Sequence, residues 1–270
     1  MAFRDHLAAA TTEKDAVSVI HGMWQHSRDN GHPLTIFENI IECPGQRAAV
    51  NLLTRERLCA AIGISPEDYI DTLGWAMSNP QQPQIISPND SPCFENIQDE
   101  VDITKLPIPH HWPQDRGRYV SASVIIAEDN GIRNMSFHRQ FVRDKNHLVV
   151  RLVPRHLRTM TMAAREEGRK VKIAIVNAPD PVVLLAAAMS FDDNVDELTI
   201  AAALHQKLYG TPLNLTTMPN GIVAPANSEY VMWGNITLEN DDEGPYVDIT
   251  GTVDDVRQEP VIEIEGVAHR

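Results

Sequence analysis

The segment RNMSFHRQF, residues 133–141, alternates apolar and polar side chains as a half-buried strand does. Its polar positions are unusual, because they carry Asn134, Ser136, His138 and Gln140, and Arg139 interrupts the apolar set. Amide, hydroxyl, imidazole and guanidinium groups together give one strand a large capacity for hydrogen bonding and ion binding. Such a strand is either a solvated face or part of a functional site.

Three more segments gather reactive side chains: VPRH (153–156), AAAMSFDDNVDE (186–197) and DDEGPYVDITG (241–251). Each also has an ordinary interpretation when taken alone. His156 follows a proline and suits a surface or capping histidine. Glu197 suits the first turn of a helix, where the helix dipole favours an acid. The segment around Glu243 suits a solvated acidic turn, in which glycine and proline are ordinary turn residues.

Common catalytic motifs are missing from the sequence. It contains no G-x-G-x-x-G, P-loop, G-x-S-x-G or H-E-x-x-H pattern, which disfavours dinucleotide, nucleotide triphosphate, serine hydrolase and zinc protease functions. The adjacent His110 and His111 are weak metal candidates, because they lie in an extended segment bounded by prolines.

The four segments follow a fixed order together with TIFENI, LPIPHHWPQDRGRYVSASV, DPVVLLAAAM and VAPANSEYVMWGNI. In this order they resemble the UbiD family of reversible decarboxylases, which use prenylated flavin mononucleotide (prenylated FMN). The resemblance covers about residues 35–270 and is strongest from Leu106 onward. It departs from the family at Trp233, where glutamate is common.

The resemblance implies a divalent metal site, usually Mn²⁺, which holds the flavin phosphate. Its ligands would be Asn134, His156 and Glu197, a donor set that suits such a cation. A K⁺ ion is expected near the backbone oxygens of Met135, Ala186, Ala187 and Met189. The full set of cofactor-binding residues implied is Asn134, Met135, Ser136, His138, Arg139, Arg155, His156, Ala186, Ala187, Met189 and Glu197.

The family's catalytic group is an arginine with two carboxylates, which here would be Arg139, Glu243 and Asp248. Decarboxylation of an unsaturated acid leaves a carbon that must be protonated, and a carboxylic acid in a semi-buried site can donate that proton. The resemblance therefore makes Glu243 the general acid. Arg139 would hold the substrate carboxylate, and Asp248 would orient Arg139.

Elements that position these residues are predicted from periodicity and capping signals. Helices are expected at 15–28, 54–63, 158–169, 180–189 and 195–210. Strands are expected at 35–41, 47–53, 119–128, 132–142, 147–153, 171–176, 228–239, 246–255 and 260–270. Asn134 and Arg139 are five residues apart, hence on opposite faces of an ideal strand, so a β-bulge or an early strand end is required. We predict a bulge between them.

Composition limits the environment and the partners. The 270 residues carry a net charge of -14, with 43% hydrophobic and 22% charged residues, and no window is apolar enough for a membrane span. Nucleic acid and membranes are therefore not expected as partners. No secretory signal is recognisable, and the three cysteines, odd in number, form no C-x-x-C pair, so we expect a cytoplasmic protein.

The sequence thus predicts an α+β protein. Residues 1–105 would form a small N-terminal α/β unit with a Pro-rich connection, and residues 106–270 a flavin-binding split β-barrel with helical insertions. The predicted function is a carboxy-lyase, or its cofactor-bearing subunit, acting on an aromatic or α,β-unsaturated carboxylic acid. The alternative is a non-catalytic flavin-binding accessory subunit. A flavin-reductase-like barrel that uses unmodified flavin is a less favoured alternative, because it would not need the asparagine, histidine and glutamate metal ligands.

Partners follow from the same resemblance. A flavin prenyltransferase would supply the cofactor. Family members usually continue into a C-terminal domain beyond the point where this sequence stops, so we expect either a homo-oligomer or a hetero-oligomer with a subunit that supplies this domain.

Overall fold

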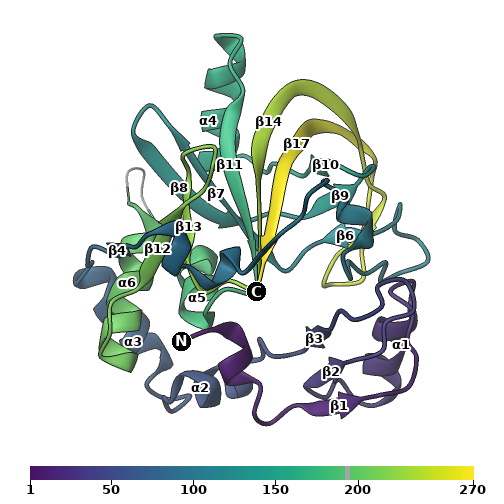
Figure 1. The fold of residues 1–270 in the computed structure, drawn as a ribbon, viewed down its shortest axis with the longest axis horizontal. Helices are drawn as coiled ribbons and strands as arrows, with labels where there is room; N and C mark the ends of the chain where they lie inside the picture. The colour runs from purple at the N-terminus through teal and green to yellow at the C-terminus, as the bar shows by residue number, and fades with distance from the viewer. Residues whose placement is uncertain (192–194) are drawn as a thin grey trace.

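A computed structural model describes residues 1–191 and 195–270. The fold is mixed α/β, as predicted (Figure 1). Its described α-helices are α1 (Gly22–Asp29), α2 (Arg55–Ile62), α3 (Tyr69–Ser78), α4 (His156–Glu166), α5 (Pro181–Ala188) and α6 (Glu197–Tyr209). Short 3-10 helices are η1 (Phe3–His6), η2 (Pro88–Asp90), η3 (Pro92–Phe94) and η4 (Ile103–Lys105).

A large antiparallel sheet forms the centre of the molecule. Its main path runs in the order β6-β9-β10-β17-β14-β11-β7-β8, and β5 adds to β17. The strands are β5 (Asn96–Ile97), β6 (Tyr119–Val120), β7 (Ser123–Asp129), β8 (Ile132–Phe137), β9 (Gln140–Val142), β10 (His147–Val150), β11 (Val171–Asn177), β14 (Tyr230–Glu243) and β17 (Arg257–His269). Long strands β14 and β17 arch side by side in Figure 1.

Both faces of this sheet are buried. Along β7, Val124 and Ile126 face a core that includes α5 and α6, whereas Ile125 and Ala127 face a second core that includes Leu157 of α4. Alternate residues of a strand point to opposite faces, so a strand covered on both sides must be apolar throughout. This explains the continuous apolar runs at β7 and β11.

Two smaller sheets flank the large one. One contains β1 (Thr11–Glu13), β2 (Thr35–Phe37) and β3 (Ala48–Val50). The other contains β4 (Gln84–Ile85), β12 (Asn214–Thr217) and β13 (Val223–Pro225). Because β4 pairs with β12 and β5 with β17, the Pro-rich connection is hydrogen bonded to strands from the second half of the chain.

Local signals in the sequence located several element ends correctly. The Thr54 hydroxyl accepts the Arg57 N–H at the start of α2, and Gly63 ends it at φ +76°. Asn130 and Gly131 both have positive φ in the β7–β8 hairpin. Asp180 caps α5 by accepting the Val182 N–H.

Several predicted elements differ in extent, among them the first helix and the strand at 246–255. The first helix begins only at Gly22, because His21 has a left-handed conformation and Val17 and Ile20 form β-bridges instead. The predicted strand at 246–255 is a hairpin of two short strands, β15 (Tyr246–Val247) and β16 (Val253–Asp254). Asp248 accepts backbone N–H groups within its turn, which divides the strand.

Candidate functional site

Arg139 lies in the break between β8 and β9, and its side chain forms hydrogen bonds to Glu243. Arg139 Nε donates to Glu243 Oε1 and Nη2 donates to Oε2, each at 2.9 Å. Glu243 is fully buried at the end of β14, whereas the Arg139 side chain is 14% exposed. A two-bond fork fixes both planar groups relative to each other. The structure thus brings together two of the three predicted catalytic residues.

The third contact of Arg139 is with Asp254 of β16. Arg139 Nη1 donates to Asp254 Oδ2 at 2.6 Å. The predicted orienting residue, Asp248, instead accepts from Thr250 and Thr252 in an exposed turn. The carboxylate that bonds Arg139 beside Glu243 in the structure is thus that of Asp254, and the orienting role of Asp248 stays a prediction. The turn of the hairpin uses Asp248 to satisfy its own backbone, and this leaves Asp254 facing the guanidinium.

Two aromatic residues that the sequence did not single out enclose this ion pair. Arg139 lies 4.4 Å from the ring centroid of Tyr246, a cation–π distance, and the Tyr246 ring packs 4.7 Å from that of Tyr119. Burial by itself lowers the pKa of Arg139, but its bonds to Glu243 and Asp254 outweigh this and raise the pKa above the ordinary value. Arg139 is therefore a permanent cation.

The predicted β-bulge between Asn134 and Arg139 is wrong, because the strand ends there. Strand β8 pairs with β7 up to Phe137, and β9 starts at Gln140 on the opposite end of the sheet path, beside β6 and β10. The chain crosses between the two ends of the sheet at His138 and Arg139. Because Arg139 lies in this crossing, its side chain does not follow the alternating directions of side chains along an ideal strand.

A chain of polar contacts continues from this crossing to Glu197. Ser136 Oγ lies 2.9 Å from both His138 Nε2 and Asn134 Oδ1, and Asn134 Nδ2 lies 2.9 Å from Glu197 Oε1. The Met135 N–H donates to Glu197 Oε2 at 2.9 Å. The polar side chains of this strand are therefore a connected, largely buried network and not a solvated face.

Proton counting shows that this network, with His138 neutral, lacks one hydrogen-bond donor. Burial lowers the pKa of His138, so its ring is neutral; Nδ1 faces the Arg151 carbonyl at 3.1 Å and must donate to it. His138 Nε2 then accepts the only proton of the Ser136 hydroxyl, so Ser136 has none left for the Asn134 oxygen. An amide flip satisfies Ser136 but turns Asn134 Oδ1 toward Glu197 Oε1. Two oxygens so placed need either a proton on Glu197, whose pKa burial raises, or a cation that both oxygens bind.

Glu197 is the buried carboxyl group of this network. It begins α6, is 4% exposed, and burial raises its pKa. The electrostatic influence of His156, the first residue of α4, opposes this rise, so the two predicted ligands lie near each other. Within residues 1–191 and 195–270 no cluster of three or more His, Cys, Asp or Glu could hold a metal. The predicted set has two such residues and an asparagine.

The remaining predicted cofactor residues lie on adjoining elements. Arg155 precedes α4 and donates to Ser190 Oγ at 3.1 Å. Ala186 and Ala187 are buried at the end of α5, and the Met189 N–H donates to the Ala186 carbonyl at 3.2 Å. Helix α5 packs on β8, the strand that carries Met135. The Asp-Asp-Asn stretch at 192–194 of the same motif lies outside the described residues.

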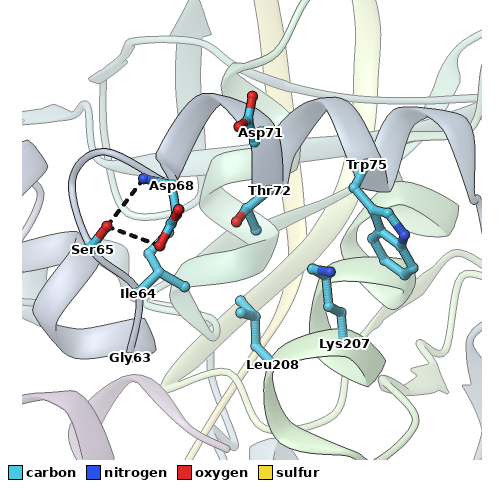
Figure 2. Close-up of a pocket in the computed structure, with 9 residues that line it drawn as sticks. All are labelled: Gly63, Ile64, Ser65, Asp68, Asp71, Thr72, Trp75, Lys207 and Leu208. Atoms are coloured by element: carbon cyan, nitrogen blue, oxygen red, sulfur yellow. Dashed lines mark hydrogen bonds between the residues drawn. The ribbon is translucent and has the colours of Figure 1, made fainter.

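Two cavities lie away from the Arg139–Glu243 pair. One of about 590 Å³ lies between the segment 63–75 and α6 and is lined by Asp68, Trp75 and Lys207 among others (Figure 2). It shares no residue with the predicted site. A second, of about 210 Å³, is lined by Arg133 and Asp196, which directly precede Asn134 and Glu197. No helix in the described part of the chain is long and apolar enough to cross a membrane.

Comparison with known proteins identifies the class to which this site belongs. Residues 84–270 match the family model UbiD, described as the 3-octaprenyl-4-hydroxybenzoate carboxy-lyase Rift-related domain. An anhydromevalonate phosphate decarboxylase from Methanosarcina mazei is 38% identical over 238 residues, which are 87% of this chain and 54% of the relative. The corresponding protein of Methanocaldococcus jannaschii is 36% identical over 80% of this chain and 50% of its own length.

Similarity to solved structures covers the whole chain. The evolved dimeric form of the UbiD-class enzyme HmfF from Pelotomaculum thermopropionicum, in complex with prFMN, superposes with a TM-score of 0.94 at 30% identity. The match covers 100% of this chain and 65% of that one. The chain belongs to the UbiD family. It spans about half the length of the curated relatives that it matches.

Proposed function

We propose that this chain is the cofactor-bearing and proton-donating part of a prenylated-FMN-dependent carboxy-lyase. Membership of the UbiD family supports the reaction class. The observation that carries the proposal is the buried Arg139–Glu243 fork, since a protein that only binds flavin has no need of a carboxyl group held against an arginine. The non-catalytic accessory subunit is the alternative that the experiment below distinguishes.

The substrate that we propose is a non-aromatic α,β-unsaturated carboxylic acid that carries a phosphate. The relatives from Methanosarcina and Methanocaldococcus are named for anhydromevalonate phosphate, which is not aromatic. This favours the unsaturated acid over the aromatic one among the two predicted classes. Arg139 would hold the substrate carboxylate, and Glu243 would protonate the carbon that loses CO₂.

Prenylated FMN, when bound, supplies the electron sink that lets an unsaturated acid lose CO₂. We propose that Asn134, His156 and Glu197 bind Mn²⁺, which neutralises the flavin phosphate in a protein of net charge -14. Arg155, Ser136 and His138 would complete the phosphate side of the site. Carbonyl groups near Met135, Ala186, Ala187 and Met189 would bind K⁺.

We also propose how the chain is built around this site. The sheet path starts at β6 and ends at β8. Along the chain, β6 is followed directly by β7, which is the neighbour of β8 in the sheet, and β8 is followed directly by β9, which is the neighbour of β6. This supports closure into a split barrel over residues 106–270, with residues 1–105 as the N-terminal unit. The active protein would be a homo-oligomer or a hetero-oligomer with a second subunit.

The first test is native mass spectrometry of the protein expressed together with a flavin prenyltransferase. A mass increase equal to prenylated FMN plus manganese, with turnover of an unsaturated phosphorylated acid, supports the proposal. Cofactor retention without turnover of any unsaturated or aromatic acid, alone or with a partner, favours the accessory subunit. Failure to retain any flavin excludes both.

A further inference from the structure

Asp115 is a buried acid to which the sequence assigned no role. It lies in the connection that precedes β6 and is 6% exposed. A carboxylate withdrawn from water needs hydrogen-bond donors that replace the lost water. The donors that meet Asp115 therefore show what its side chain does in the fold.

Each carboxylate oxygen of Asp115 accepts one backbone N–H. Oδ2 accepts the Trp112 N–H at 3.0 Å, and Oδ1 accepts the buried Val247 N–H at 2.8 Å. The Asp115 N–H in turn donates to the Trp112 carbonyl at 3.0 Å, so the first contact closes a local turn. The second contact joins residues that are 132 positions apart in the chain. Asp115 therefore ties the connection before β6 to strand β15, which begins at Tyr246.

The hairpin of β15 and β16 presents two side chains to Arg139. Val247 directly follows Tyr246, whose ring centroid lies 4.4 Å from the guanidinium carbon of Arg139. Tyr246 pairs across the hairpin with Asp254, whose carboxylate accepts from Arg139 Nη1 at 2.6 Å. Directly opposed residues of antiparallel strands keep a fixed spacing, so both contacts depend on where the hairpin lies. A hydrogen bond that fixes Val247 thus fixes both contacts of Arg139.

Two further contacts from the same part of the chain hold the backbone just before β15. The Arg116 N–H donates to the Pro245 carbonyl at 2.9 Å. The Gly244 N–H donates to Tyr119 Oη at 3.2 Å. Together with the bond from Asp115, these contacts hold the backbone that leads from β14 into the hairpin. Asp115 differs from the other two, because its side chain accepts two N–H groups at once.

Resting on the proposed function, we propose that Asp115 is a positioning residue for Arg139. Its carboxylate holds β15 so that Tyr246 lies against the guanidinium and Asp254 meets Nη1. Held in this direction, Arg139 receives the substrate carboxylate. Asp115 acts only through the hairpin and is not itself a catalytic residue. The role requires a carboxylate, because two N–H donors converge on it and a side-chain amide has only one oxygen to accept them.

The positioning can be measured without cofactor or substrate. Arg139 Nε–H donates to Glu243 at 2.9 Å, and the guanidinium lies against the Tyr246 ring, so the NMR signal of this group depends on both neighbours. In protein with isotope-labelled arginine, the signal is assigned as the one that Arg139→Lys removes. Asp115→Asn should shift it, because the new NH₂ group meets one of the two N–H donors. A signal at the wild-type position would overturn the proposal, whatever reaction the protein catalyses.

Turnover separates a positioning role from a purely structural one. Loss of folded protein lowers the active fraction, so it lowers the apparent kcat and leaves KM unchanged. A displaced Arg139 holds the substrate carboxylate less well, so Asp115→Asn should raise KM about ten-fold, as for the loss of one charge-assisted hydrogen bond. A shifted arginine signal with an unchanged KM in the loaded protein would overturn the proposed role.

Asp102→Asn is the matched control. Asp102 is also 6% exposed and also lies before β6, but its Oδ1 accepts the Thr104 N–H at 3.1 Å within its own turn. This variant should leave the Arg139 signal and KM as in the wild type. If Asp115→Asn does not fold, Asp115→Glu takes its place with the same expected changes, because it moves both oxygens by one methylene group. If the wild type shows no turnover, the proposed function fails and the arginine signal alone decides whether Asp115 positions Arg139.

Discussion

Arg139 and Glu243 are separated by 104 residues and meet through two hydrogen bonds of 2.9 Å each. The glutamate is fully buried, and the arginine is its charged partner. Burying a carboxylate requires such a partner, and removing one member leaves the other uncompensated. The contact between Arg139 and Glu243 therefore matters both for the stability of the fold and for the proposed reaction.

Replacement Glu243→Gln should abolish turnover and preserve cofactor binding. Glutamine keeps the shape of the side chain but cannot supply the proton, and loss of a general acid typically costs roughly 10²-fold to 10⁴-fold in rate. Steady-state kinetics together with the flavin absorbance spectrum measures both effects. Glu239→Gln, an exposed position on the same strand that pairs with Arg143, is the control. Turnover that survives Glu243→Gln would mean that another group is the acid.

Asp254→Asn should impair turnover more than Asp248→Asn does. Asp254 accepts a hydrogen bond of 2.6 Å from Arg139, and its replacement leaves Nη1 of the guanidinium without this partner. Asp248 instead accepts a hydrogen bond from the backbone of its own turn. We expect KM for the substrate to change about ten-fold in Asp254→Asn, as for the loss of one charge-assisted hydrogen bond. The opposite ranking in the kinetics of the two variants would support Asp248 as the residue that orients Arg139.

Glu197→Gln should release manganese and flavin together. The carboxylate is the one buried negative charge in the proposed set, and its amide isostere cannot neutralise a divalent cation. Metal content by mass spectrometry and flavin absorbance should both fall, with metal affinity reduced at least about 100-fold. Glu167→Gln, at an exposed position after α4, is the control. Retention of both metal and flavin by Glu197→Gln would exclude Glu197 as a ligand.

His6 should make stability depend on pH above pH 6.5. Burial lowers its pKa, but the hydrogen bond and charge of Asp180 and the Ala61 carbonyl outweigh this, so the pKa is raised above 6.5. The folded state then binds the proton more tightly than the unfolded chain does. The stabilisation is complete below pH 6.5 and is lost as pH rises through the raised pKa.

Denaturant unfolding of the wild type and His6→Gln across this range measures that effect. The difference in unfolding free energy between the two should shrink as pH rises. A difference that is constant with pH would mean that the buried His6 is neutral.

Gly266→Ala should destabilise the fold, and Gly74→Ala should not. A Cβ atom on Gly266 would lie 1.9 Å from Cζ2 of Trp233, so the indole would have to move within a packed core. We expect a loss of roughly 1–3 kcal/mol in unfolding free energy. Gly74 lies in α3 with open space around it, and alanine there should add about 0.5–1 kcal/mol. Equal effects in denaturant unfolding would contradict this packing.

Much of the local structure was determined by short-range signals. The Thr54 and Gly63 ends of α2, the Asn130–Gly131 hairpin and the Asp180 cap all depend on neighbouring residues, so the sequence predicts them. The start of α1 does not, because residues 17–20 are drawn into bridges with Ile40 and His110. The domain boundary at residue 105 stays a prediction.

The candidate site was likewise predicted from the sequence only in part. By itself, the ordered set of motifs determined the family and directed attention to Arg139, Glu243, Asn134 and Glu197. Only the tertiary structure decided that Asp254 and not Asp248 meets Arg139, that Tyr119 reaches the Glu243 turn, and that a strand ends where a bulge was expected. These contacts join segments that are over a hundred residues apart, or depend on which edge of the sheet a strand joins. Sequence spacing carries no information about such contacts, because the sheet as a whole sets them.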